Sequence, residues 1–270
     1  MEQKCKIIET CVLYIDIRKS TDLNLSHRRG TMAKLYSSFV RAMARAGGYY
    51  SGKVRNIIGD RLMVLFNVEN CFSNAINTAI LMNSVCQHIL DKEFSHNAVK
   101  CGIGIDYGKM LVTKAGIIKN GTENTSNKSL VWLGRPANVA SKLTDVANKT
   151  TTVSRNLVRE GYYFPNLENK WFWINREFEE FIDMLQPTFS NVIRHGGECF
   201  SSFFRTNDIS ISTNPPILIT KDVFNGIQRE NPLHQVIREN YLTVQPHIKV
   251  SGYNDEIYGG DPCYEIFADK

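Results

Sequence analysis

Two aspartates, each at the end of an apolar stretch, are the residues whose type and spacing most clearly suggest chemistry. Asp16 follows the apolar residues 12–15, and Asp60 lies in the turn of a predicted β-hairpin with strands at 53–58 and 61–66. Carboxylates at neighbouring strand ends suit Mg²⁺, a hard ion that binds a few protein oxygens and leaves other positions to water and phosphates. Either aspartate alone would read as an ordinary turn carboxylate, so the prediction of a metal site depends on further motifs.

The turn after Asp16 carries basic and hydroxyl side chains that, with backbone amides, can form a small anion-binding nest. Its residues are Arg18, Lys19, Ser20 and Thr21. We expect this turn to face the phosphates of a substrate.

The elements that must position these residues follow from the apolar pattern. After the first Asp strand, we expect helices at 31–46, 71–90 and from Pro136 onward, strands at 99–105, 109–113 and 130–133, and a polar loop at 114–129. The order strand, helix, hairpin, helix, strand predicts a ferredoxin-like α+β sandwich.

The 270 residues fit a single domain, 1–270, with an insertion at about 144–215. The insertion is rich in aromatic residues, which argues against a flexible linker, and we expect it to be folded and mostly helical. Beyond it we expect a strand at 216–220 followed by a helix, and then strands near 247–250 and 263–267.

Composition predicts a cytoplasmic protein that binds neither membrane nor nucleic acid. No apolar run is long enough to span a bilayer, and the first residues lack the apolar core of a secretion signal. The seven cysteines are scattered without a CxxC pair, as expected of reduced core thiols. A net charge of +5 is mild and suits a polyanionic small molecule, but no basic cluster is interleaved with aromatic residues.

Two further stretches complete a series of motifs. Residues 101–108 read Cys-Gly-Ile-Gly-Ile-Asp-Tyr-Gly, and residues 131–143 read Val-Trp-Leu-Gly-Arg-Pro-Ala-Asn-Val-Ala-Ser-Lys-Leu. With the Asp16 and Asp60 stretches, the series resembles the class III nucleotidyl cyclases (adenylyl and guanylyl cyclases) in motif type, order and spacing. The resemblance covers roughly residues 8–143 and 215–268, and it implies that the sandwich is a cyclase catalytic core.

In that family two metal ions activate the ribose 3′-hydroxyl for attack on the α-phosphate, yielding a 3′,5′-cyclic nucleotide and pyrophosphate. The resemblance implies that Asp16, the backbone carbonyl of Ile17 and Asp60 bind two divalent ions, Mg²⁺ or Mn²⁺. One ion would lower the pKa of the hydroxyl and the other would neutralise phosphate charge.

The family also places an Asn that orients the ribose and an Arg that stabilises the transition state on one helix. Here these positions are Asn138 and Lys142, and a lysine lacks the planar fork of a guanidinium. Arg135 is one candidate to supply it; Lys119 and Lys128 are weaker phosphate candidates. Because the metal face and the Asn/Lys face come from different subunits in the family, the resemblance implies a homodimer with composite sites.

Two positions read the base in the family, and here they are Asn56 and Val131, which match neither purine code. An Asn carboxamide can pair with uracil or, flipped, with cytosine. If residues 50–56 form one strand, Tyr50 shares the face of Asn56 and its ring could fill the extra volume of a purine. The pattern resembles the bacterial Pycsar anti-phage cyclases, so we expect UTP as substrate and cyclic UMP as product, with CTP open.

Three other functions remain open from the sequence. A cyclase with an unusual pocket would turn over ATP or GTP. A nucleotide-sensing module that has lost turnover is favoured by Lys142 and opposed by the paired aspartates. A structural dimerisation domain would be indifferent to the loss of Asp16.

Overall fold

The computed structural model describes residues 5–94, 99–115, 118–119, 122–123, 129–165, 170–188 and 192–267. The chain divides into two compact units, a core unit of residues 1–149 and 214–270 and an insert unit of residues 150–213.

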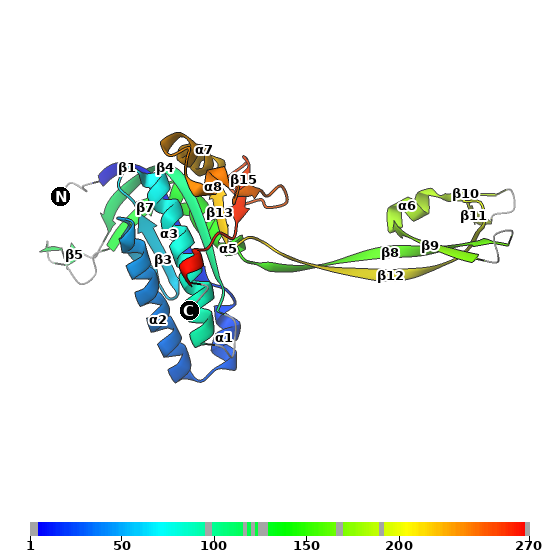
Figure 1. Cartoon of the computed structure of the whole chain (residues 1–270), viewed down its shortest axis with the longest axis horizontal. Coiled ribbons are helices and arrows are strands. Elements are labelled where there is room, and N and C mark those ends of the chain that lie inside the picture. The colour runs from blue at the N-terminus through cyan, green and yellow to red at the C-terminus, as the bar shows by residue number, and fades with distance from the viewer. Residues whose placement is uncertain are drawn as a thin grey trace. The chain divides into compact units, whose positions relative to one another are not determined.

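The core unit is built on an eight-stranded sheet in the order β14-β15-β13-β4-β1-β3-β2, with β7 paired to β4 (Figure 1). Its strands are β1 (Cys5–Ile17), β2 (Lys53–Ile58), β3 (Arg61–Leu65), β4 (Cys101–Ala115), β7 (Ser129–Leu133), β13 (Ile217–Thr220), β14 (Thr243–Val244) and β15 (Ile257–Gly260). All pairs are antiparallel except β13 with β4, which is parallel. The short strands β5 (Ile118–Lys119) and β6 (Thr122–Glu123) pair separately.

Helices cover both faces of this sheet. They are α1 (Ser20–Ser26), α2 (Arg29–Tyr49), α3 (Cys71–Val85), α4 (Asp91–Glu93), α5 (Arg135–Val146), α7 (Lys221–Glu230) and α8 (Gln235–Arg238), with a π-helical stretch at Cys86–Leu90 joining α3 to α4 and a 3₁₀ turn at Glu265–Phe267. The main core packs α2, α3 and α7 against one face, and α5 packs on the other.

The alternation of side chains along β1 decides which face receives the first aspartate. Leu13 and Ile15 enter the core under α2 and α3, whereas Val12 and Tyr14 lie with the residues of α5 on the other face. Because side chains alternate along a strand, Asp16 falls on the α5 face.

The structure confirms the α+β sandwich, the hairpin and the helices expected near 31–46, 71–90 and from Pro136. Two expectations about the strands of the core unit are wrong. Residues 101–115 form one continuous strand, because all of it pairs with β1 or β7. The regions 247–250 and 263–267 are not strands: the first holds only an isolated bridge from Val250 to Tyr253, and the second holds the 3₁₀ turn.

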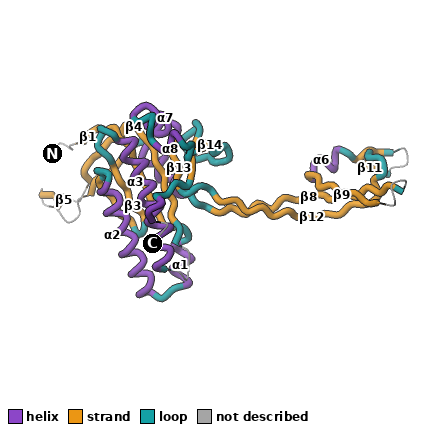
Figure 2. The backbone as a smooth tube through the Cα atoms, viewed as in Figure 1, coloured by secondary structure: helices purple, strands orange, loops and turns teal. Residues whose placement is uncertain are grey.

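The insert unit is mostly β-structure, which corrects the expectation of helices (Figure 2). Its three-stranded sheet, in the order β12-β8-β9, consists of β8 (Thr150–Phe164), β9 (Lys170–Glu177) and β12 (Phe200–Thr213). Its described residues also form the helix α6 (Phe178–Asp183) and a hairpin of β10 (Leu185–Pro187) with β11 (Ile193–His195). Aromatic and β-branched side chains dominate β8 and β9 and favour strands.

Polar and aromatic contacts organise this small unit. Glu160 is fully buried and accepts hydrogen bonds from Tyr162 (2.6 Å) and Arg176 (2.9 Å). Although burial opposes ionisation, these two bonds outweigh it and lower the pKa of Glu160. The indoles of Trp171 and Trp173 stack with their centroids 5.5 Å apart.

The chain leaves and re-enters the core unit at one place. The backbone N–H of Asn214 donates to the carbonyl of Lys149 over 3.1 Å. The two ends of the insertion are therefore tied together on the core unit itself.

Candidate functional site

Asp16 is the second-to-last residue of β1, and its side chain is only 18% exposed. Its Oδ2 accepts a hydrogen bond of 2.6 Å from Nη2 of Arg61, and Nη2 of Arg18 lies 3.6 Å away. The first predicted metal ligand is therefore held by a cation from the neighbouring strand.

Asp60 lies in the β2–β3 turn, next to Asp16. Burial, followed by the charge of Asp16, raises the pKa of Asp60, and a hydrogen bond with Ser20 works in the opposite direction. Within the described part of the chain, Oδ2 of Asp60 is buried and has no hydrogen-bond partner. The structure thus brings Asp16, Asp60 and Ser20 together, as the sequence suggests.

This pair of carboxylates fits a divalent cation. Two like charges held close together, one with a buried and unpartnered oxygen, are stabilised by a hard cation that takes oxygen ligands. The described residues contain no group of three or more His, Cys, Asp or Glu side chains that could hold a metal. The remaining ligands would have to come from backbone, water or substrate.

Arg61 is a site residue that the sequence did not reveal. Its Nη1 donates to Oγ of Ser141 over 2.9 Å, and its Nη2 pairs with the carboxylate of Asp145 as well as with Asp16. Ser141 and Asp145 are both on α5. Its position directly after Asp60 is the one available signal, but its partners on α5 are distant in sequence.

The turn after β1 makes several contacts with the rest of the core unit. Nη1 of Arg18 donates to the carbonyl of Asp145 (3.0 Å), and its backbone N–H bonds to the carbonyl of Lys100 (2.7 Å). Lys19 has a left-handed backbone (φ 53°) at the start of α1, and both Lys19 and Thr21 are exposed. Nη1 of Arg18 is thus engaged within the chain, whereas its Nε and Nη2 are buried without a hydrogen-bond partner among the described residues. Its role at the phosphates stays a prediction. The side chain of Ile17 is buried.

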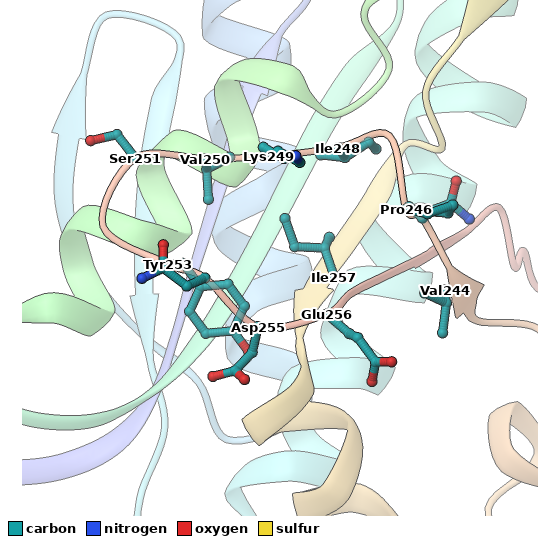
Figure 3. A pocket seen from close by; sticks show the side chains of 12 residues that line it. Val244, Pro246, Ile248, Lys249, Val250, Ser251, Tyr253, Asp255, Glu256 and Ile257 are labelled. Carbon is teal, nitrogen blue, oxygen red and sulfur yellow. The ribbon is translucent and has the colours of Figure 1, made fainter.

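Lys142 and Asn138 lie on another part of α5. Asn138 is exposed, and Nζ of Lys142 donates to the carbonyl of Ser251 over 2.8 Å. Ser251 belongs to a loop that lines a cavity of about 600 Å³ and carries Lys249 (Figure 3). Lys142 therefore contacts the loop of residues 249–252, which begins with Lys249 and ends with Gly252.

Arg135, the candidate for the missing guanidinium, contacts residues of β4 and α7. Its Nη2 pairs with Asp222 at 2.6 Å and donates to the carbonyl of Tyr107 at 3.2 Å, while its Nε lies 3.6 Å from Asp106. The guanidinium also lies 5.6 Å from the ring centroid of Tyr253. These contacts tie the start of α5 to β4 and α7. The side chain of Lys119, and Lys128 as a whole, lie outside the described residues.

The two predicted base-reading residues are far apart within one chain. Asn56 is half-buried and pairs with Met63 of β3, on the α5 face of the sheet; Val131 pairs with β4 near its far end. Strands β3, β1 and β4 separate the two, through the register pairs Met63–Tyr14, Tyr14–Gly104 and Thr113–Val131. With ~4.8 Å between strands and ~3.3 Å per residue, they lie on the order of 30 Å apart.

The structure corrects the steric role expected of Tyr50. Tyr50 is the C-cap residue directly after α2 and does not lie on a strand, and its hydroxyl lies 3.0 Å from that of Tyr264. A β-bulge between Val54 and Asn56 also breaks the alternation, so Val54 faces the α2 side and Asn56 the α5 side. Gly52 is required by packing, since a Cβ there would lie 2.3 Å from the carbonyl oxygen of Gly47.

The described helices include none long and apolar enough to cross a membrane. All seven cysteines are free thiols, and four of them are buried.

Comparison with known proteins adds three findings. The family model described as the adenylate and guanylate cyclase catalytic domain matches residues 3–164. A uridylate cyclase from Gulbenkiania mobilis is 30% identical over 183 residues, covering 61% of this chain and 69% of that protein. A uridylate cyclase from Burkholderia cepacia is 28% identical over 151 residues, covering 54% of this chain and 63% of that protein. The chain thus spans about two thirds of the length of these curated relatives.

Among solved structures, the adenylyl cyclase CyaB from P. aeruginosa superposes with a TM-score of 0.56 at 14% identity, covering 94% of both chains. At this identity the likeness shows a shared fold.

Proposed function

This chain belongs to the adenylate and guanylate cyclase catalytic domain family, and from that membership we propose that it is a pyrimidine nucleotidyl cyclase that converts UTP to 3′,5′-cyclic UMP and pyrophosphate. The observation that carries the proposal is the adjacent pair Asp16 and Asp60, with the buried, unpartnered Oδ2 of Asp60. The two uridylate cyclases to which the chain is similar support the choice of base.

Asp16, Asp60 and the backbone carbonyl of Ile17 would hold two divalent ions, Mg²⁺ or Mn²⁺. When bound, such ions lower the pKa of a ribose hydroxyl and offset the charge of the triphosphate. Ser20 holds the Asp60 carboxylate in place. In the reaction the 3′-oxygen forms a bond to the α-phosphorus, and the bond from that phosphorus to the oxygen of the β-phosphate breaks.

We propose that the site is completed by a second copy of the chain. Asn56 of one copy would read the base through its carboxamide, and Val131 of the other copy would close the base pocket. The separation of these two residues within one chain supports this arrangement. Asn138 and Lys142 of the second copy would contact the ribose and the phosphates, with Lys142 acting as a point charge.

The biological setting remains part of the same proposal. The resemblance to the Pycsar cyclases favours a cytoplasmic enzyme whose cyclic nucleotide serves as an anti-phage signal. We further propose that the insert unit belongs to one functional domain with the core.

The proposal is tested by offering equimolar ATP, GTP, CTP and UTP with Mn²⁺ to the full-length protein and identifying the products by mass spectrometry. We expect cyclic UMP, and its loss in Asp60→Ala. Cyclic CMP would keep the pyrimidine class and change the substrate, while cyclic AMP or GMP would overturn the assignment of Asn56. No product from any triphosphate would favour a nucleotide-binding module, for which the engagement of Asp16 by Arg61 already offers some support.

A further inference from the structure

Arg61 links the proposed metal site to the helix that carries the opposite half of the proposed active site. The same guanidinium contacts Asp16 on β1 and both Ser141 and Asp145 on α5. It is 25% exposed, whereas the side chain of Asp145 is 54% exposed. Arg61 therefore has one partner in a partly buried site and one at the surface.

The contact with Asp16 is one that a metal ion would contest. Nη2 of Arg61 lies 2.6 Å from Oδ2 of Asp16, so a cation that ligates this oxygen must compete with a charge-assisted hydrogen bond. A guanidinium carries five N–H donors in a planar fork, and besides the bond to Asp16 its Nη1 and Nη2 already donate to Ser141 and Asp145 of α5. Losing Asp16 would therefore leave Arg61 with two partners.

We propose that Arg61 is a positioning residue that exchanges Asp16 for a full engagement of Asp145 and Ser141 when a divalent cation binds Asp16. This inference rests on the proposed metal-binding role of Asp16 and Asp60. Through Arg61, occupancy of the metal site fixes the C-terminal half of α5, and Lys142 lies next to Ser141 on that helix. Asp145 is the carboxylate with which Arg61 pairs after it leaves Asp16.

The exchange predicts opposite effects on cation affinity, which can be measured by titrating Mn²⁺ alone into the full-length protein in a calorimeter. Arg61→Met removes the competitor, so Mn²⁺ should bind more tightly, by about threefold or more. Asp145→Asn weakens the pairing of Arg61 with residue 145, so Arg61 stays on Asp16 and Mn²⁺ should bind more weakly by a similar factor.

The double variant separates exchange from simple electrostatics. Removing the negative charge of Asp145 would weaken cation binding in any background if only its field mattered. Under the proposal, the effect of Asp145→Asn disappears once Arg61 is Met, because no guanidinium remains to be redirected. An equal effect in both backgrounds would overturn the proposal.

Asp222→Asn is the matched control, because Asp222 also pairs with an arginine at 2.6 Å and is 45% exposed, but its partner is Arg135. It should leave Mn²⁺ affinity unchanged. If Arg61→Met does not fold, as judged by its melting temperature in EDTA, Arg61→Lys replaces it in the cycle, since a lysine cannot reach both partners with a fork.

Failure of this inference is distinct from failure of the proposed function. Mn²⁺ binding with the expected pattern, but no cyclic nucleotide from any triphosphate, would keep the role of Arg61 and remove the cyclase assignment. Formation of a cyclic nucleotide by the wild-type protein, with Mn²⁺ affinity unchanged in Arg61→Met, would keep the cyclase assignment and overturn the role of Arg61. Absence of Mn²⁺ binding by the wild-type protein would overturn the inference.

Discussion

Nζ of Lys142 donates a hydrogen bond to the backbone carbonyl of Ser251 over 2.8 Å, on a different side of α5 from the metal-site contact. The neighbouring residue Ser141 meets Arg61 at 2.9 Å, and successive residues are turned about 100° around a helix. Within one chain, α5 thus holds Lys142 toward the loop of residues 249–252 and Ser141 toward Arg61.

A composite site should be detectable by mixing two inactive variants. We expect Asp60→Ala and Lys142→Met each to lose activity as pure proteins. After unfolding and refolding together, half of the dimers pair one variant with the other and contain one intact site, so activity should return to about a quarter of wild type. Lack of recovery, with mixed dimers shown by native mass spectrometry, would contradict a site shared between subunits.

Asn56 and Tyr50 should differ sharply in their effect on base choice. Asn56→Ala removes the carboxamide proposed to pair with the base, so we expect kcat/KM for UTP to fall by about tenfold or more. Tyr50→Ala should leave the ratio of UTP to ATP turnover unchanged, because Tyr50 directly follows α2 and contacts Tyr264. A gain of ATP turnover in Tyr50→Ala would restore the steric role that the structure argues against.

Asp106 should make the protein's stability depend on pH. It is fully buried, it accepts a hydrogen bond of 2.7 Å from Thr220, and burial raises its pKa. A carboxyl with a raised folded-state pKa costs stability once it is ionised, so this penalty is absent below the unfolded pKa of about 3.9 and grows as pH rises through the folded value. Asp106→Asn should therefore melt higher than wild type at pH 8.

The control for this prediction is the same comparison in acid. The difference in melting temperature should shrink as pH falls toward about 4. A difference that is equal at both pH values would assign the effect to packing of the amide.

Gly161 should be needed for the indole pair of the insert unit. A Cβ at this position would lie 2.7 Å from the ring of Trp173 and 3.1 Å from that of Trp171. Gly161→Ala should separate the stacked rings, at a cost of about 1–3 kcal/mol in unfolding free energy. The readout is the exciton signal of coupled indoles in circular dichroism, measured in a Trp132→Phe background because the chain has three tryptophans. An unchanged signal would mean that the pair tolerates the added methyl group.

The sequence predicted the parts of this structure that depend on local pattern. The apolar run before Asp16 and the turn at Asp60 sufficed to predict a carboxylate at each of two strand ends, because strand ends and tight turns leave short-range signals. The pairing of the two carboxylates in one site was expected only with the further motifs. The bulge before Asn56 left no such signal, and one extra residue moved Asn56 to the opposite face from Val54.

Long-range polar contacts could not be predicted from the sequence for another reason. The partners of Arg61 on α5 lie more than 75 residues away, and periodicity carries no information about which charges will meet. In the insert unit a signal was present but misread. Tyr162, Tyr163 and the run from Trp171 to Ile174 are strand-forming residues. Their aromatic content argues against a flexible linker, but it does not favour helices over strands.

The hydrogen bond between Lys149 and Asn214 makes the insert unit a cassette, that is, a segment that can be removed or exchanged as a whole. Its two ends meet on the core unit at 3.1 Å, so a short linker could replace residues 150–213 at little entropic cost. The core unit and its two aspartates would then be free to diverge independently of the inserted segment. In engineering terms, this junction is a site at which a foreign domain can be inserted into the core unit.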